Sequence, residues 1–99
     1  MNPVRPIWFY TYVLKSLKDN NFYTGVTTNL KERFKEHNKG LVSSTKYRRP
    51  LQLIYYEACL DKNDAHRREK YLKTGMGKKY LKNRLKRTLQ ENMGGGLTG

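Results

Sequence analysis

Two segments decide the fold of this chain: Phe9-Tyr10-Thr11-Tyr12-Val13-Leu14 and Phe22-Tyr23-Thr24-Gly25-Val26. Both are rich in β-branched and aromatic residues, which favour strands. Between them, Lys18-Asp19-Asn20-Asn21 has the composition of a turn, because Asn and Asp tolerate left-handed backbone and form local hydrogen bonds. We therefore predict a β-hairpin, with a first strand over residues 7–14 and a second over residues 22–26.

Downstream of this hairpin, the sequence predicts a helix, a loop and a third strand. The helix begins after Asn29, whose side chain can cap it, with Glu32 three residues later in the pattern of a capping box. It ends near Gly40, because glycine is the usual left-handed residue after a helix. Residues 41–50 show no clear hydrophobic period and are expected to form a basic, polar loop before a strand over residues 51–58.

Two further helices complete the predicted domain. One begins at Asp61 or Asn63 and ends at Gly75, and the other runs from about residue 78 to residue 89 with a leucine stripe on its buried side. The order β-β-α-β-α-α predicts an α+β fold, a three-stranded and mostly antiparallel sheet flanked by helices. We expect residues 1–91 to form one domain and the glycine-rich residues 92–99 to be a disordered tail.

The strongest signal in the composition is positive charge. The chain of 99 residues has 21 Lys and Arg against 8 Asp and Glu, a formal net charge of +13. Ten of these basic residues and a single acid lie in residues 67–87. Such clustering favours a nucleic-acid partner over a merely soluble surface or an anionic membrane. We therefore predict binding to DNA through a surface that includes Lys78, Lys79 and Lys82.

The remaining composition bounds the setting of the protein. The lone Cys59 excludes an internal disulfide and fits a reduced compartment. Residues 1–6 contain no apolar core of a signal peptide, and no stretch approaches the roughly 20 apolar residues of a membrane span. We expect a cytoplasmic protein without a membrane anchor, acting as a monomer whose selectivity is weak or borrowed from a targeting partner.

The first predicted helix carries two polar residues that attract attention. At steps of three, four and seven residues, one side of this helix holds Leu30, Arg33, Phe34 and His37. The two apolar residues should face the sheet, which puts Arg33 and His37 at the edge of the packed side. An arginine there is ordinarily a buried stem with a solvated head, although its planar donors also suit phosphate oxygens. His37 alone is an ordinary histidine favoured by the helix dipole.

Glu69 is a carboxylate on an otherwise apolar stripe of the next helix, with Ala65 four residues before it and Leu72 three after. Basic residues surround it in the sequence, so an ion pair is one interpretation. A metal ligand is the other, because Mg²⁺ is often held by one or two carboxylates together with phosphate and water. The spacing of the histidines and Cys59 does not fit a zinc site.

Tyr12 and Tyr23 lie on the two hairpin strands, where tyrosine is common for packing reasons alone. A phenol is a weak base at neutral pH, since its reference pKa is about 10. Nearby positive charge lowers that pKa, and we expect this basic chain to supply such charge.

In order, spacing and residue type, these residues resemble the GIY-YIG nuclease family over residues 7–89. Tyr12 matches the tyrosine that ends the first motif of the family, and Tyr23 matches the one that opens the second. Arg33 follows ten residues after Tyr23, and Glu69 is the carboxylate on a later helix. The second-motif glycine is kept, where it lets the backbone bend or approach a ligand. The departures from the motifs are Tyr10, Thr11 and Thr24.

The resemblance implies a role for each of these residues. Arg33 would contact the substrate phosphate, His37 would be a polar helper, and Glu69 would be the single ligand of one divalent ion, Mg²⁺ or Mn²⁺. One tyrosine would accept a proton from an attacking water while the other orients it. Asn83 matches a late asparagine near the active site. The tyrosine, arginine and glutamate side chains would then converge on one concave surface.

The function implied is that of a divalent-metal-dependent endonuclease that hydrolyses phosphodiester bonds in DNA. The residues alone leave two alternatives open: a non-catalytic, basic nucleic-acid-binding module, and an interaction domain associated with the ribosome or with another protein. Cleavage that depends on a divalent ion separates the first from both others. Salt-sensitive binding without cleavage favours the second.

Overall fold

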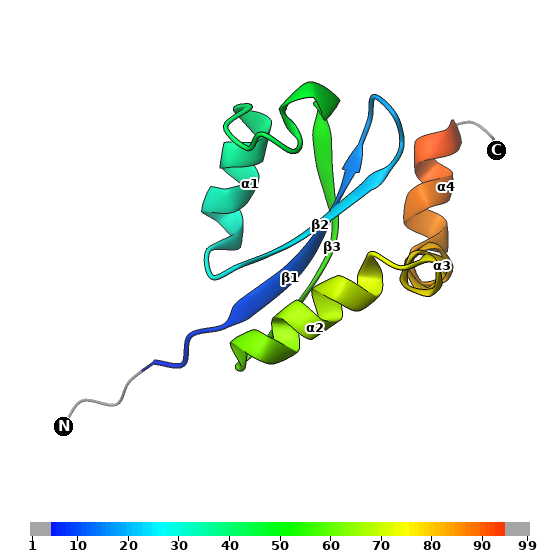
Figure 1. Cartoon of the computed structure of the whole chain (residues 1–99). Helices are drawn as coiled ribbons and strands as arrows, with labels where there is room; N and C mark the ends of the chain where they lie inside the picture. Colours follow the sequence, from blue (N-terminus) through cyan, green and yellow to red (C-terminus); the bar gives the residue numbers. More distant parts are fainter. Residues whose placement is uncertain (1–4, 95–99) are drawn as a thin grey trace.

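The computed structural model describes residues 5–94, with side chains for residues 5–90, and confirms the predicted α+β fold (Figure 1). The sheet consists of β1 (Phe9–Ser16), β2 (Phe22–Thr27) and β3 (Leu51–Cys59), in the order β2-β1-β3. Both pairs of neighbours are antiparallel, so β1 is the central strand and β2 and β3 are the edges. The three predicted strands are all found, with small shifts at their ends.

A turn joins β1 to β2 and fixes their register. The Ser16 hydroxyl accepts hydrogen bonds of 3.1 Å from the backbone N–H groups of Lys18 and Asp19. Asn20 has a φ of 63°, the left-handed conformation that asparagine tolerates better than most residues. The predicted turn is therefore confirmed, and in the register that it sets Tyr12 lies opposite Gly25.

Side-chain caps begin the first two helices. At the start of α1 (Leu30–Asn38), the Asn29 side chain accepts a bond of 3.1 Å from the Glu32 N–H. At the start of α2 (Lys62–Leu72), the Asp61 carboxylate accepts bonds from two backbone N–H groups. These caps satisfy donors that have no partner in the first turn of a helix. Asp61, rather than the alternative Asn63, is thus the residue that opens α2.

The chain after α2 differs from the prediction. Gly75 does not close α2, which ends at Leu72, but begins α3 (Gly75–Arg84). The reason is Thr74, whose hydroxyl accepts a bond of 3.0 Å from the Gly77 N–H and caps the new helix.

The single helix predicted over residues 78–89 is two helices, because α4 (Lys86–Gly94) begins after an interruption at Leu85. In the predicted leucine stripe, Leu81 is fully buried, whereas Leu85 and Leu89 are half-buried. A four-residue spacing of leucines is compatible with an unbroken helix and could not reveal this interruption.

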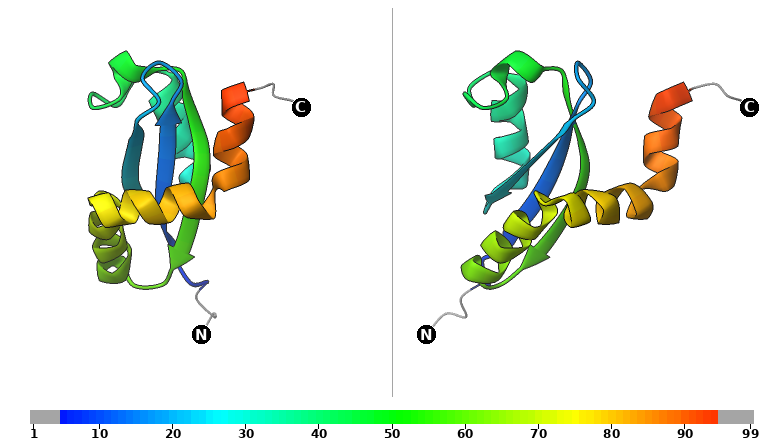
Figure 2. Two further views of the ribbon diagram at one scale, coloured as in Figure 1. Left: turned by 90° about the vertical axis from the view of Figure 1, so that its right-hand side faces the viewer. Right: turned by 45° about the vertical axis from the view of Figure 1, so that its right-hand side comes forward.

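Helices cover both faces of the sheet (Figure 1, Figure 2). The buried cluster beneath α1 consists of Tyr12, Leu14 and Leu51. The buried cluster beneath α2 and α3 consists of Val13, Leu72 and Leu81. Because successive side chains of a strand point to opposite faces, β1 contributes to both clusters. Any site near β1 can therefore draw residues from both helical layers.

The predicted tail over residues 92–99 lies only partly in the described chain. Helix α4 continues to Gly94, and residues 95–99 lie outside the described residues. The domain boundary at residue 91 stays a prediction. Within residues 5–94, none of the helices has the length and apolar character that crossing a bilayer requires.

Gly77→Ala should destabilise the protein. Gly77 is buried where α3 packs on the end of α2, and an added Cβ would lie 2.5 Å from the Leu72 Cα, a backbone atom that cannot move aside by rotation. We expect the free energy of unfolding, measured by urea denaturation, to fall by about 1–3 kcal/mol, the scale of overpacking. Gly75→Ala is the matched control, because no atom lies within 4 Å of its added Cβ. Equal losses in both variants would contradict this interpretation.

Candidate active site

The Tyr12 ring lies across Gly25 of the neighbouring strand. Tyr12 is only 1% exposed, and a Cβ placed on Gly25 would lie 2.6 Å from the Tyr12 hydroxyl. Any other residue at position 25 would thus displace the ring. From the sequence, we interpreted Gly25 as a residue that lets the strand bend or lets the backbone approach a ligand. The structure instead shows that the space above Gly25 is filled by the tyrosine of β1.

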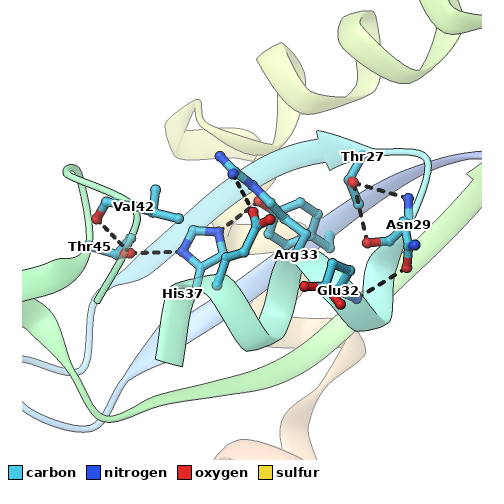
Figure 3. Close-up of polar contacts among 9 residues, drawn as sticks. Thr27, Asn29, Glu32, Arg33, His37, Val42 and Thr45 are labelled. Atoms are coloured by element: carbon cyan, nitrogen blue, oxygen red, sulfur yellow. Dashed lines mark hydrogen bonds and ion pairs between the residues drawn. The ribbon is translucent and has the colours of Figure 1, made fainter. Parts of the chain in front are cut away.

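A chain of hydrogen bonds continues from this hydroxyl through α1 (Figure 3). The Tyr12 hydroxyl lies 2.8 Å from His37 Nε2, and His37 Nδ1 lies 2.8 Å from the Thr45 hydroxyl. The Thr45 hydroxyl in turn donates a long bond of 3.5 Å to the Val42 carbonyl. His37 and Thr45 are both completely buried. Three elements, namely β1, α1 and the loop after α1, are therefore joined by one buried polar chain.

The surroundings of His37 keep its imidazole neutral. Burial, assisted by the charge of Arg33, lowers the pKa of His37 to about 4. Because the Thr45 hydroxyl gives its proton to Val42, it can accept one from Nδ1. Nε2 is then the acceptor of the Tyr12 hydroxyl proton. The helix dipole, which favours a charged histidine at this end of α1, is outweighed by burial.

Tyr12 does not have the lowered pKa that the sequence analysis expected. Burial raises the pKa of Tyr12, and the opposing effect of Arg33 is smaller. That expectation was wrong for Tyr12 because it considered the charge of the chain and not the position of the residue in the central strand. Tyr12 is therefore a neutral phenol that donates to His37.

Arg33 reaches the same hydroxyl from one turn earlier in α1. Its Nη1 lies 2.9 Å from the Glu36 carboxylate. The bond to Glu36, and after it the interaction with the Tyr12 hydroxyl, raise the pKa of Arg33. Its side chain is 37% exposed. The guanidinium is thus held by two partners and still presents part of its surface to solvent.

Tyr23 completes the aromatic part of the site. Its ring centroid lies 5.1 Å from that of His37 and 6.4 Å from that of Tyr12. Within residues 5–90, the Tyr23 hydroxyl forms no hydrogen bond, unlike that of Tyr12. Tyr23 is half-buried, so its free hydroxyl can bind water.

Glu69 comes from α2, on the opposite face of the sheet. Its carboxylate lies 3.0 Å from His66 Nδ1 and 3.2 Å from Lys73 Nζ, and its side chain is 19% exposed. The charge of Glu69 contributes to the raised pKa of Tyr12, after burial and the charge of Tyr23.

Glu69 offers one carboxylate, and a hard divalent ion can be held by one carboxylate when water and phosphate complete its coordination. In the described part of the chain, no group of three or more His, Cys, Asp or Glu residues could enclose a metal. Each carboxylate oxygen has a second lone pair beyond the one used by His66 or Lys73. Both partners are at least half exposed, so their exchange for an ion costs little.

Of the predicted site residues, the structure brings together Tyr12, Tyr23, Arg33 and His37, and the charge of Glu69 acts on Tyr12. Asn83 is exposed on α3, and within residues 5–90 no hydrogen bond or ion pair joins it to them. The three lysines predicted to bind nucleic acid are also exposed on α3. The roles of all these residues stay predictions.

Sequence reasoning missed Thr45 and Glu36, the partners of His37 and Arg33. Glu36 lies three residues after Arg33, so helical spacing could have indicated that pair. Thr45 lies in the loop over residues 41–50, where the sequence has no periodic pattern to place it.

The free energy of unfolding should fall as the pH is lowered from about 6.5 to about 4 because of His37. The folded protein keeps His37 neutral down to a pKa of about 4, whereas the ordinary pKa of a histidine side chain is 6.5. In this window the unfolded chain binds more protons, so acid favours unfolding by up to about 3 kcal/mol. Urea titrations at a series of pH values measure this fall. His37→Gln can bond to Tyr12 but cannot titrate, and an equal slope in that variant would exclude His37 as the cause.

This chain is similar to a described protein family and to several known proteins. Residues 8–86 match the family model described as the GIY-YIG catalytic domain. A UPF0213 protein of Staphylococcus haemolyticus is 45% identical over 74 residues, 74% of this chain and 89% of that protein. One of Desulfotalea psychrophila is 41% identical over 71 residues, 70% of this chain, and the match spans 63% of that relative, less than two thirds of its length.

Among solved structures, the NMR structure of a UPF0213 protein of Bacillus halodurans is 34% identical. The match covers 89% of this chain and 87% of that one, with a TM-score of 0.41. The family match includes both tyrosines of the hairpin, Arg33 and Glu69. It therefore confirms the resemblance inferred from the sequence: this chain belongs to the GIY-YIG family.

Proposed function

We propose that this protein is a divalent-metal-dependent endonuclease that hydrolyses phosphodiester bonds in DNA. The observation that carries the proposal is the environment of the Tyr12 hydroxyl, which bonds to His37 and is acted on by Arg33 and Glu69. A proton acceptor, a cation for the phosphate and a carboxylate for a metal ion are what phosphodiester hydrolysis needs. Membership of a family whose model is described as catalytic supports the same function.

In this proposal the pair of Tyr12 and His37 carries the proton of the attacking water. Burial raises the pKa of Tyr12, so a free phenolate is rare at neutral pH. The water gives its proton to the Tyr12 oxygen while the Tyr12 proton passes to His37 Nε2, 2.8 Å away. No separate phenolate has to form. Tyr23, with its free hydroxyl, orients the water.

Arg33 and Glu69 act on the phosphate in this proposal. The exposed part of the Arg33 guanidinium binds a phosphate oxygen and stabilises the charge that develops there. A divalent ion held by Glu69, Mg²⁺ or Mn²⁺, would supply positive charge for the leaving oxygen. The ion pair with Glu36 holds Arg33 in position before the substrate arrives.

One observation favours the alternative of a non-catalytic nucleic-acid-binding module. Both carboxylate oxygens of Glu69 already have a partner, which is the arrangement of a structural ion pair. An interaction domain bound to the ribosome or to another protein rests on the charge alone. That the protein is a cytoplasmic monomer directed by a targeting partner stays a prediction.

Glu69→Gln should abolish cleavage and leave DNA binding intact or slightly tighter. The amide keeps the shape of the side chain but removes the charge that holds a divalent ion. Nicking of supercoiled plasmid and cutting of branched DNA with Mg²⁺ or Mn²⁺, repeated with a chelator, measure the first effect. If the variant instead melts at a lower temperature and cuts equally well per folded molecule, Glu69 is structural and the proposed metal site is wrong.

Arg33→Ala should lower kcat/KM for cleavage. We expect a loss of transition-state stabilisation of about 2–4 kcal/mol, the scale of one donor to a developing oxyanion. Its control is Arg67→Ala on α2, where the arginine is 80% exposed and, among residues 5–90, pairs only with Asp64 at 3.6 Å. Steady-state cleavage rates of both variants test the difference. Equal losses would mean that Arg33 contributes only general charge.

A further inference from the structure

Lys15 is a lysine whose side chain is largely buried in the central strand. It is 7% exposed, lies opposite Phe22 in register and faces the same side of the sheet as Val13. Within residues 5–90, its ammonium group has no hydrogen bond or ion pair. Every fully buried side-chain nitrogen among these residues has a hydrogen-bond partner. Because the Lys15 ammonium group has none, it must be partly exposed to solvent. It is exposed in a cleft that Lys15 lines.

This cleft, which we call the lysine cleft, has a volume of about 520 Å³ and is lined by residues of the β1–β2 hairpin and of the helices α3 and α4. Its basic side chains are Lys15, Lys82 and Lys86. Phe22 and Leu89 give it apolar walls. A recess of about 70 Å³ shares Phe22 and Lys82 with the cleft and adds Lys78.

The lysine cleft holds positive charge that the described residues do not neutralise. No acidic side chain is among the described residues that line the cleft or its recess. Asp19, next to the lining residue Asn20, pairs instead with Arg48 at 3.1 Å. Within residues 5–90, the four lysines form no ion pair. Like charges gathered in one concave surface repel one another, and an anion between them removes that repulsion.

We propose that the lysine cleft binds a phosphate group of a nucleic-acid strand, with the adjoining nucleoside against Phe22 and Leu89. The choice of a nucleic acid among anions rests on the proposed function. The apolar walls suit a nucleoside better than a bare anion, because aromatic side chains stack on bases. Three lysines in one cleft suit a phosphate, which each contacts as a point charge.

The place of the cleft relative to the candidate active site agrees with this role. Lys15 follows Tyr12 by three residues on β1, about 10 Å along the strand, and points to the opposite face. Phe22 and Tyr23 are likewise neighbours on edge strand β2. A strand of DNA has one phosphate per about 3.4 Å of helix axis. A strand whose reacting phosphate lies at Arg33 therefore reaches the cleft within a few nucleotides by passing around β2.

Lys15→Met tests the proposal, because methionine keeps an apolar stem and removes the charge. The readout is the Kd for a fluorescent single-stranded oligonucleotide in the presence of chelator, so that no cleavage occurs. We expect Kd to rise about tenfold. The slope of log Kd against log salt concentration should fall by about 1, the change for one lost phosphate contact. Lys82→Ala combined with Lys86→Ala changes only exposed residues and should give a loss of similar kind if Lys15→Met fails to fold.

Lys62→Met is the matched control, an exposed lysine at the start of α2 that lies outside the lysine cleft and its recess. Its Kd should stay within about twofold of the wild type, the scale of a surface charge. A loss equal to that of Lys15→Met would show that only net charge matters and would overturn the proposal. Wild-type protein that binds but does not cut would reject the proposed nuclease and leave the cleft supported.

Inorganic phosphate separates the two sources of the ligand. Backbone amide NMR signals of Lys15, Phe22 and Lys82 should shift on addition of micromolar oligonucleotide. Inorganic phosphate at millimolar concentration should neither shift them equally nor displace the oligonucleotide. If phosphate alone saturates the cleft and the oligonucleotide shifts signals elsewhere, the cleft is a site for a free anion and the proposal is wrong.

Discussion

The hydrogen bond between the Tyr12 hydroxyl and His37 is the interaction on which the rest of the site depends. It is buried and joins residues 25 positions apart, so it fixes α1 against the central strand. The donor, Tyr12, fits only because Gly25 has no side chain. The acceptor, His37, is held by Thr45 at its other ring nitrogen. A buried polar pair is costly unless every member has a partner. Here every member has one, which explains why a small core can contain a histidine.

Burial and positive charge act against each other on the pKa of Tyr12, and burial is the larger effect. A net charge of +13 should lower the pKa of a tyrosine. The pKa of Tyr12 is nevertheless raised, because its side chain is buried. The same burial lowers the pKa of His37. Both groups are therefore neutral, and in the proposed transfer from Tyr12 to His37 the tyrosine stays uncharged because the attacking water replaces its proton at the same time. Lys15 has no such partner among residues 5–90, and the proposal assigns its charge to a bound phosphate.

Much of the fold could be predicted from the sequence because its signals are local. Alternating β-formers, a turn rich in Asn and the cap at Asn29 each act over a few residues. Spacing along α1 put Arg33 and His37 on one side, which is correct, but His37 is completely buried rather than at the edge of that side. Three features depend on contacts between distant segments, which a pattern in one segment cannot contain. They are the break at Leu85, the role of Thr45 and the reason for Gly25. Asn83 was assigned by resemblance alone, and its role stays a prediction.

The candidate site lies where two layers meet, with α1 on one face of the sheet and Glu69 supplied by α2 from the other. Neither layer contains all the groups that the proposed hydrolysis needs. A chain in which only one helix has docked on the hairpin would have incomplete machinery, so synthesis or unfolding would not release a working nuclease fragment into the cell. Under the proposed function, only the fully folded protein could then cleave DNA. The two-layered arrangement of the site would itself prevent cleavage by partly folded chains.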